Sequence, residues 1–229
     1  MKNSHKAYRS GDELIVAGAG AAIFAALGYC AHNGRLDDLN QRVRSLLLHA
    51  DPETLHVARR ITLLSESPVH PVLGYVLSRT ASRILGRHTR VPLHASIVEF
   101  VVNKATRLFV HQPRPAGAKP RTGLDRRGYP SGHTLAATAI AFATALELAE
   151  GRDRSDRKFL LGVAAAYAGT IGWTRLVLDE HWLDDVLGAW AGGIALAILV
   201  HRVERARRER QRGGKRHAPR IRSYSRTGS

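Results

Sequence analysis

Several features that would point to a fold or a function are scarce in this sequence. It contains a single cysteine, Cys30, so no intrachain disulfide can form and cysteine usage says nothing about the compartment. We find no internal repeat, and most of the 12 histidines follow no spacing typical of metal ligands. The sequence therefore predicts neither a metal site nor a cofactor.

Acidic residues are also few, because 19 Asp and Glu stand against 35 Lys and Arg, a formal charge of +16. Such a balance suggests phosphate-bearing partners such as nucleic acid, anionic lipid or a phosphorylated substrate. Between Arg202 and Arg226 there are 11 basic and 2 acidic residues, with no interleaved aromatic residue before Tyr224. We therefore predict that residues 202–229 form a disordered cytoplasmic tail that contacts anionic lipid and does not bind nucleic acid.

Long apolar segments, in contrast, are present. Residues 14–31 are 18 uncharged residues, about the length that crosses a bilayer. A cleaved signal peptide begins in the same way, but later segments rich in Ala, Gly and Leu also resemble membrane spans. We expect an all-α integral-membrane bundle of six helices within a domain of residues 1–201. The expected spans are residues 14–31, 61–78, 91–110, 134–149, 159–178 and 183–201, of which the second and third are interrupted by charges or prolines.

An amphipathic segment lies between the first two expected spans. In residues 35–58, Leu36, Leu39, Val43 and Leu47 fall on one helical face among charged residues. This pattern predicts a helix that lies on the membrane surface. Under the six-span arrangement, the side that holds both termini carries 22 Lys and Arg, against 11 on the other side. Cytoplasmic loops are enriched in these residues, so we predict a plasma-membrane protein with both termini in the cytoplasm.

Three clusters of polar residues lie near the predicted outer ends of spans three to six, where ionisable groups are functional candidates. The first is Arg107, six further residues, then Arg114 and Pro115. The second is Pro130, Ser131, Gly132 and His133. The third is Thr174 and Arg175, five further residues, His181, three further residues and Asp185.

These residue types suit phosphoryl transfer. The guanidinium groups of three arginines match phosphoryl oxygens in shape and charge. The Ser131 hydroxyl and the backbone N–H groups of Gly132 and His133 would open a helix, and helix N-termini bind anions. On a helix, His181 and Asp185 would share a face, so the carboxylate can hold one imidazole nitrogen while the other attacks phosphorus. His133 is then available as a general acid.

Together the three clusters resemble the signature of the type 2 phosphatidic acid phosphatase superfamily. Its usual form is Lys, six residues, Arg-Pro; then Pro-Ser-Gly-His; then Ser-Arg, five residues, His, three residues, Asp. The resemblance implies His181 as a nucleophile that becomes a phosphohistidine, Asp185 as its orienting partner and His133 as the acid. It also implies phosphate binding by the remaining matched residues, Arg107, Arg114, Ser131, Gly132 and Arg175.

This sequence departs from the usual pattern at two positions. Arg107 stands where the family usually has Lys, and Lys104, one helical turn earlier, is an alternative source of the first positive charge. Thr174 replaces Ser and keeps the hydroxyl group. Asp184 is an alternative to Asp185 as the orienting carboxylate, although the four-residue spacing from His181 favours Asp185.

The resemblance implies a lipid phosphatase that acts without metal, and the predicted orientation places its site at the outer face of the membrane. Its substrate would be a polyprenyl diphosphate, such as undecaprenyl diphosphate, or a phosphatidic-acid-like lipid. Alternatives are a lipid-linked phosphotransferase with the same phosphohistidine, a vanadate-haloperoxidase-like enzyme and a non-catalytic membrane protein with a vestigial site. A basic nucleic-acid-binding protein is the alternative that charge alone suggests.

Overall fold

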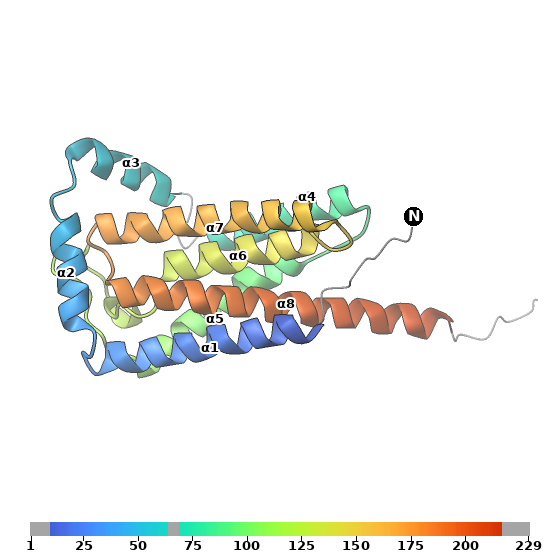
Figure 1. The fold of residues 1–229 in the computed structure, drawn as a ribbon, viewed down its shortest axis with the longest axis horizontal. Helices are drawn as coiled ribbons and strands as arrows, with labels where there is room; N and C mark the ends of the chain where they lie inside the picture. The colour runs from blue at the N-terminus through green and yellow to red at the C-terminus, as the bar shows by residue number, and fades with distance from the viewer. Residues whose placement is uncertain (1–9, 64–68, 217–229) are drawn as a thin grey trace, which may run out of the picture.

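The described part of the chain, residues 10–63 and 69–216 of the computed structural model, is built from α-helices with no β-strand (Figure 1). The helices are α1 Ser10–His32, α2 Asp37–Leu47, α3 Pro52–Thr62, α4 Val69–Leu85, α5 Val91–Phe109, α6 Gly132–Leu148, α7 Arg154–Val177 and α8 Leu183–Arg216. A short 3-10 helix, Gly123–Arg126, lies in the connection between α5 and α6. The prediction of an all-α fold is confirmed.

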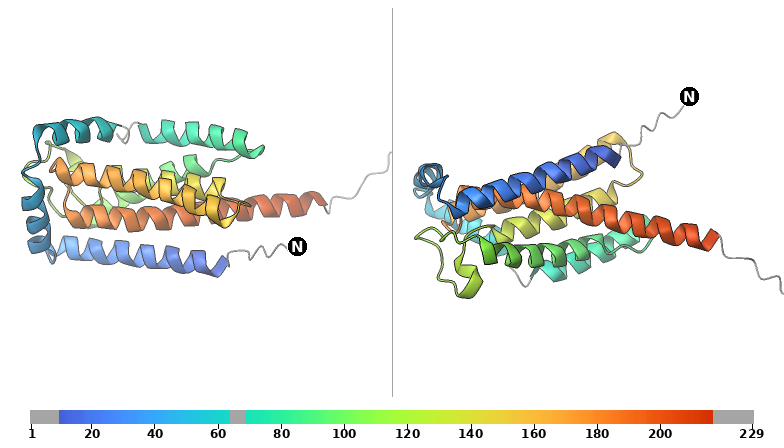
Figure 2. Two further views of the ribbon diagram at one scale, coloured as in Figure 1. Left: turned by 45° about the horizontal axis from the view of Figure 1, so that its top comes forward. Right: turned by 90° about the horizontal axis from the view of Figure 1, so that it is seen from below.

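The long helices form a bundle in which α8 packs against both α6 and α1 (Figures 1 and 2). Small residues allow the close approach. A methyl group added at Gly193 of α8 would lie 2.6 Å from Thr138 Cβ of α6, and one at Gly20 of α1 would lie 2.7 Å from the Ala191 carbonyl oxygen of α8. Contacts this short are forbidden, so glycine is required for these helices to pack as they do.

The two ends of the bundle differ. At one end, α2 runs across the helix ends, close to the α5–α6 connection and the α7–α8 turn (Figures 1 and 2). At the other end, α1 begins and α8 extends beyond the bundle (Figure 1). The three sequence clusters therefore lie at the end that α2 covers.

The expected surface helix over residues 35–58 is in fact two helices, α2 and α3. The break has a local cause. Asp51 caps α3 by accepting a 2.8 Å hydrogen bond from the Thr54 N–H, and Pro52 occupies the first helical position. Proline at this position favours a new helix start because it has no N–H to donate to a preceding turn.

The boundaries of the second and sixth expected spans also differ from the structure. Of residues 61–78, residues 64–68 lie outside the described part, and α4 begins at Val69 and continues to Leu85. Arginine is a good helix former, so Arg79 and Arg83 do not end α4. Helix α8 likewise continues from the expected span to Arg216, so the first part of the expected disordered tail is helical, and residues 217–229 lie outside the described residues.

Three of the described helices are long and apolar enough to cross a membrane by themselves: Gly11–His32, Arg154–Val177 and the Leu183–Arg212 part of α8. Helix α5 has a suitable length but carries Glu99, Lys104 and Arg107. These three side chains line one small polar cavity.

Candidate active site

The third cluster forms a hydrogen-bonded pair at the turn between α7 and α8. His181 lies in this turn and not in a helix, while Asp185 lies in the first turn of α8. The His181 Nδ1 atom is 2.9 Å from Asp185 Oδ2, and both side chains are buried. The same carboxylate oxygen accepts a 3.0 Å hydrogen bond from the Trp182 N–H. The predicted four-residue pairing therefore forms without a continuous helix.

The other imidazole nitrogen identifies the tautomer. The Arg114 Nη1 atom lies 2.9 Å from His181 Nε2. A guanidinium group can only donate, so Nε2 must be the acceptor and the ring proton must reside on Nδ1, facing Asp185. The Nε2 lone pair is consequently directed toward the arginine cluster, as a nucleophile for a bound phosphoryl group requires.

The electrostatic surroundings keep this imidazole neutral. Burial, together with the nearby positive charge of Arg114, lowers the pKa of His181 well below its usual value of 6.5. Burial also lowers the pKa of Arg114 itself, to about 10, with the charge of Arg107 as the next cause. Near neutral pH the site therefore combines an uncharged imidazole with charged guanidinium groups.

Asp184 does not take the place of Asp185. Its carboxylate accepts hydrogen bonds from Asn40 Nδ2 at 2.9 Å, from Gln112 Nε2 at 3.1 Å and from the Asp185 N–H at 2.9 Å. The hydrogen bond to His181 is made by Asp185.

The second cluster opens α6 and joins the third cluster directly. Helix α6 begins at Gly132, as the sequence predicts, and the Ser131 side chain is buried, with its Oγ atom 2.9 Å from Thr134 Oγ1. The Ser131 N–H donates a 3.1 Å hydrogen bond to the Asp185 carbonyl oxygen. This bond joins the start of α6 to the start of α8.

The first cluster reaches the same place from α5 and the connection that follows it. Arg107 is buried, and its guanidinium donates to the Pro130 carbonyl oxygen at 3.1 Å and to Asp125 Oδ1 at 2.6 Å. Lys104 also contacts Asp125 Oδ1, at 2.8 Å, but is about one-third exposed. Because Arg107 is buried against Pro130 of the second cluster, it lies nearer to the predicted phosphate-binding residues than Lys104 does.

A small polar cavity lies where these groups meet. Its lining includes Arg107, Arg114, Gly132 and His133 from the predicted set, and also Lys104. His181 does not line this cavity and adjoins it through the Arg114 guanidinium. The cavity extends to His70 and Glu99, two buried side chains whose Nδ1 and Oε1 atoms are 3.3 Å apart and which the sequence analysis does not single out.

Glu180 is a further residue that the sequence analysis misses. Its buried Oε2 atom lies 3.4 Å from Arg175 Nη2, 3.6 Å from Arg121 Nη2 and 3.8 Å from Arg114 Nη1. One carboxylate thus reduces the repulsion among three guanidinium groups. Its position directly before His181 is the only sequence signal that could have drawn attention to it.

Comparison with known families matches residues 92–209 to the PAP2 superfamily. This stretch includes all three clusters and more than half of the chain. The chain belongs to the PAP2 superfamily. No curated protein matches the sequence of this PAP2 chain.

Two solved structures resemble the fold of this PAP2 chain. A transmembrane PAP2 type phosphatidylglycerolphosphate phosphatase from Bacillus subtilis aligns with a TM-score of 0.72 at 19% identity, covering 82% of this chain and 96% of that one. LpxE from Aquifex aeolicus aligns with a TM-score of 0.55 at 24% identity, covering 72% and 95%. At these identities the likeness concerns the fold. Together with the three apolar helices, it identifies this PAP2 chain as a membrane protein.

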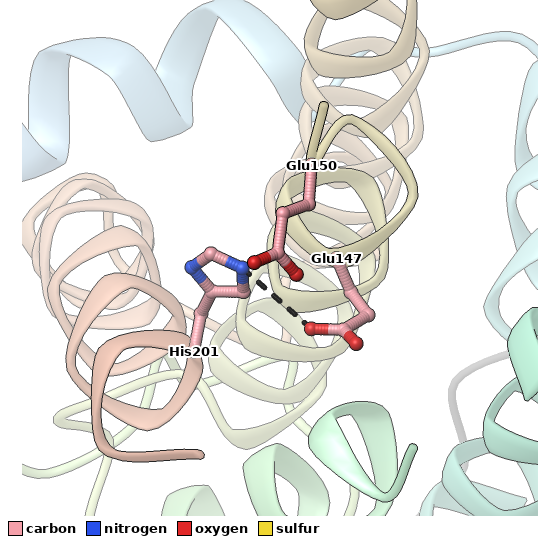
Figure 3. A group of neighbouring side chains, drawn as sticks. All are labelled: Glu147, Glu150 and His201. Atoms are coloured by element: carbon pink, nitrogen blue, oxygen red, sulfur yellow. Dashed lines mark ion pairs between the residues drawn. The ribbon is translucent and has the colours of Figure 1, made fainter. Parts of the chain in front are cut away.

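One group of side chains elsewhere in this PAP2 chain offers three metal-ligand atoms. The ligand atoms of Glu147, Glu150 and His201 lie within 4.8 Å of one another (Figure 3). Three arginines already pair with the carboxylates: Arg87 Nη1 is 2.7 Å from Glu147 Oε1, Arg208 Nη2 is 3.0 Å from Glu150 Oε2, and Arg205 Nε is 3.8 Å from Glu150 Oε1. These guanidinium groups would repel a metal cation. We therefore interpret the group as an ion-pair network that joins α6, α8 and the α4–α5 connection.

Proposed function

We propose that this chain is a metal-independent lipid phosphatase that uses His181 as its nucleophile. The observation that carries the proposal is the hydrogen-bonded series Asp185, His181 and Arg114, in which the two outer groups leave only one possible place for the imidazole proton. A neutral nucleophile beside cationic phosphate ligands is the arrangement that phosphoryl transfer needs.

In the proposed reaction, Arg107, Arg114 and Arg175 hold the phosphoryl oxygens with the N–H groups at the start of α6. The Ser131 hydroxyl lies at the same helix start. His181 Nε2 forms a bond to phosphorus as the bond to the lipid oxygen breaks, and His133 protonates that leaving oxygen. His133 then takes a proton from water, which attacks the phosphohistidine, releases inorganic phosphate and restores both histidines.

The position of the site supports a lipid substrate. A phosphate site at the end of a bundle of apolar helices is suited to a head group whose hydrocarbon chain stays in the membrane. We propose a polyprenyl diphosphate or a phosphatidic-acid-like lipid. Phosphatidylglycerol phosphate joins these candidates because one structurally similar protein is a phosphatase for that lipid.

The direct test is release of phosphate by the purified protein in detergent with excess EDTA. The panel contains undecaprenyl diphosphate, phosphatidic acid and phosphatidylglycerol phosphate. We expect phosphate release from at least one of them without divalent metal. Phosphate transfer to an added alcohol in place of water would identify a phosphotransferase. Cleavage of none of the three lipids would contradict the proposal.

We further propose six spans, α1 and α4 to α8, with α2 and α3 at the outer membrane surface. Residues 1–201 would then form the phosphatase domain. The start of α1 and the end of α8 lie at the end of the bundle away from the site, which supports termini in the cytoplasm and an active site at the outer face (Figure 1). Exposed arginines on the α8 extension, such as Arg210 and Arg212, would face anionic lipid.

Cysteine labelling in intact cells tests this orientation. With Cys30→Ser as background, Lys119→Cys should react with an impermeant maleimide and Arg152→Cys should react only after permeabilisation. The opposite pattern would reverse the proposed orientation.

The low pKa of His181 predicts the acidic side of the pH profile. Burial and Arg114 hold this pKa well below 6.5, so the imidazole stays neutral until the pH falls well below that value. We expect kcat/KM, which reports the ionisations of the free enzyme, to show no loss from protonation of His181 as the pH falls through 6.5 and to show that loss only at lower pH. A protonation midpoint at or above 6.5 that persists when each of the other histidines is replaced would belong to His181. Such a midpoint would contradict the assignment of His181 as the neutral nucleophile.

The first cationic position can be assigned by paired variants. Arg107→Gln removes a buried guanidinium next to the second cluster, and we expect kcat/KM to fall about 10²-fold. Lys104→Gln removes a partly exposed charge, so its effect should stay below about tenfold. Arg107→Lys, which restores the usual family residue, should recover most of the activity. A larger loss from Lys104→Gln than from Arg107→Gln would reverse the assignment.

A further inference from the structure

Helix α2 is hydrogen-bonded to both ends of the segment that carries His181. On one side, Arg44 donates from Nε to Asp179 Oδ1 at 2.7 Å and from Nη2 to Asp179 Oδ2 at 2.8 Å. On the other side, Asn40 Nδ2 donates to Asp184 Oδ2 at 2.9 Å, and the Asp184 N–H donates to Asn40 Oδ1 at 3.3 Å. The two aspartates bracket His181 in the sequence.

The contacts of Asn40 and Arg44 restrict the positions of Asp184 and Asp179. Asn40 and Asp184 are both buried, and the Arg44–Asp179 pair is bidentate and partly buried. A bidentate arginine–carboxylate pair fixes orientation as well as distance, unlike a single exposed ion pair. Arg44 also lies over the Trp182 ring, 5.9 Å from its centroid.

Arg44 contacts a residue with an unusual backbone conformation, Asp179. Asp179 has a φ of +53°, a left-handed conformation that is unfavourable for a residue with a side chain. Besides Arg44, the Gly117 N–H donates to its carboxylate at 3.0 Å. Arg44 thus helps to hold the bend of the chain two residues before His181.

Asp184 connects Asn40 of α2 to Asp185, which holds the other side of the imidazole. Its Oδ1 atom accepts the Asp185 N–H at 2.9 Å, and Asp185 in turn holds His181 Nδ1. Helix α2 also closes the back of the imidazole. The space among Asn40, Arg44 and His181 is only about 10 Å³, roughly the least that admits one water molecule.

We propose that Asn40 and Arg44 are positioning residues that set the place of the His181 imidazole through Asp184 and Asp179. This inference rests on the proposed function, in which His181 is the nucleophile. Neither residue belongs to the three sequence clusters, and neither lines the small polar cavity beside Arg107 and Arg114. Their removal should therefore slow the chemical step and leave substrate binding nearly unchanged.

The test compares Arg44→Gln with Arg42→Gln, an equal loss of charge at an exposed position of the same helix. With the lipid that the wild type cleaves fastest, Arg44→Gln should lower kcat at least tenfold and change KM less than about threefold, because small displacements of a reacting group slow catalysis strongly. Arg42→Gln should match the wild type. Arg44→Lys keeps the charge without the fork and should be intermediate.

Imidazole nitrogen NMR gives a readout that does not depend on turnover. The His181 signal is identified by its loss in His181→Ala. It should shift or broaden in Arg44→Gln and in Asn40→Ala, and stay in place in Arg42→Gln. An unmoved His181 signal in both α2 variants would overturn the inference, as would an effect of Arg44→Gln on KM alone.

The same experiments separate failure of the inference from failure of the proposed function. If the wild type and His181→Ala are equally active or equally inactive, the proposed function is wrong, and the NMR comparison still decides whether α2 positions the imidazole. If His181→Ala alone is inactive and Arg44→Gln behaves as the wild type in both measurements, the inference is wrong and the function stands.

Discussion

Replacing His181 by alanine is expected to lower kcat by about 10³-fold or more, because the substitution removes the proposed nucleophile. The arginines that would bind phosphate remain in place, so KM should change much less than kcat. The measurement is phosphate release from the best lipid substrate, with protein folding checked by thermal unfolding. Acid-quenched wild-type enzyme should also contain an acid-labile phosphoenzyme that the variant lacks.

The matched control is His88→Ala, which removes an exposed histidine from the α4–α5 connection, at the opposite end of the bundle from the site. It should retain wild-type activity. If His181→Ala keeps more than a few per cent of the activity, or if phosphate is trapped on serine, His181 is not the nucleophile.

Asp185→Asn is expected to lower kcat by about 10²- to 10⁴-fold through the tautomer of His181. An amide that donates to Nδ1 would move the ring proton to Nε2, where it would face the Arg114 guanidinium, which is itself only a donor. The nucleophilic lone pair would then point away from the phosphate. The measurement is kcat for the best substrate, together with the imidazole nitrogen shifts of His181.

Asp184→Asn serves as the comparison for this variant. Asp184 accepts from Asn40 and Gln112 and does not contact the imidazole, so we expect a reduction of about tenfold or less and no change of tautomer. A greater loss from Asp184→Asn than from Asp185→Asn would transfer the orienting role to Asp184.

The charge balance of the site explains how several arginines coexist in a buried place. Glu180 lies within 4 Å of three guanidinium groups, and Asp125 contacts both Arg107 and Lys104. Without such counter-charges, burying like charges together would strongly destabilise the fold. A bound phosphate would supply further negative charge to the same guanidinium groups that these carboxylates neutralise.

Some features of this fold follow from local sequence rules. The start of α6 at Gly132 and the pairing of His181 with Asp185 depend on residues close in the chain. The break between α2 and α3 was also readable, because Asp51 followed by Pro52 is a standard helix start. The apolar face that continues across the break predicts one helix instead, and this prediction is wrong.

The all-α class, the motif residues and the family could be predicted without the fold, because apolar run length and motif spacing are properties of residues that lie near one another in the chain. Which distant groups hold the motif in place depends on how the helices pack. Asn40 and Arg44 lie more than 130 residues before Asp184 and Asp179, and Thr62 of α3 accepts a 2.6 Å hydrogen bond from Arg175 across 113 residues. No periodicity in the chain encodes such contacts, since they arise when helices that are remote in sequence pack at one end of the bundle.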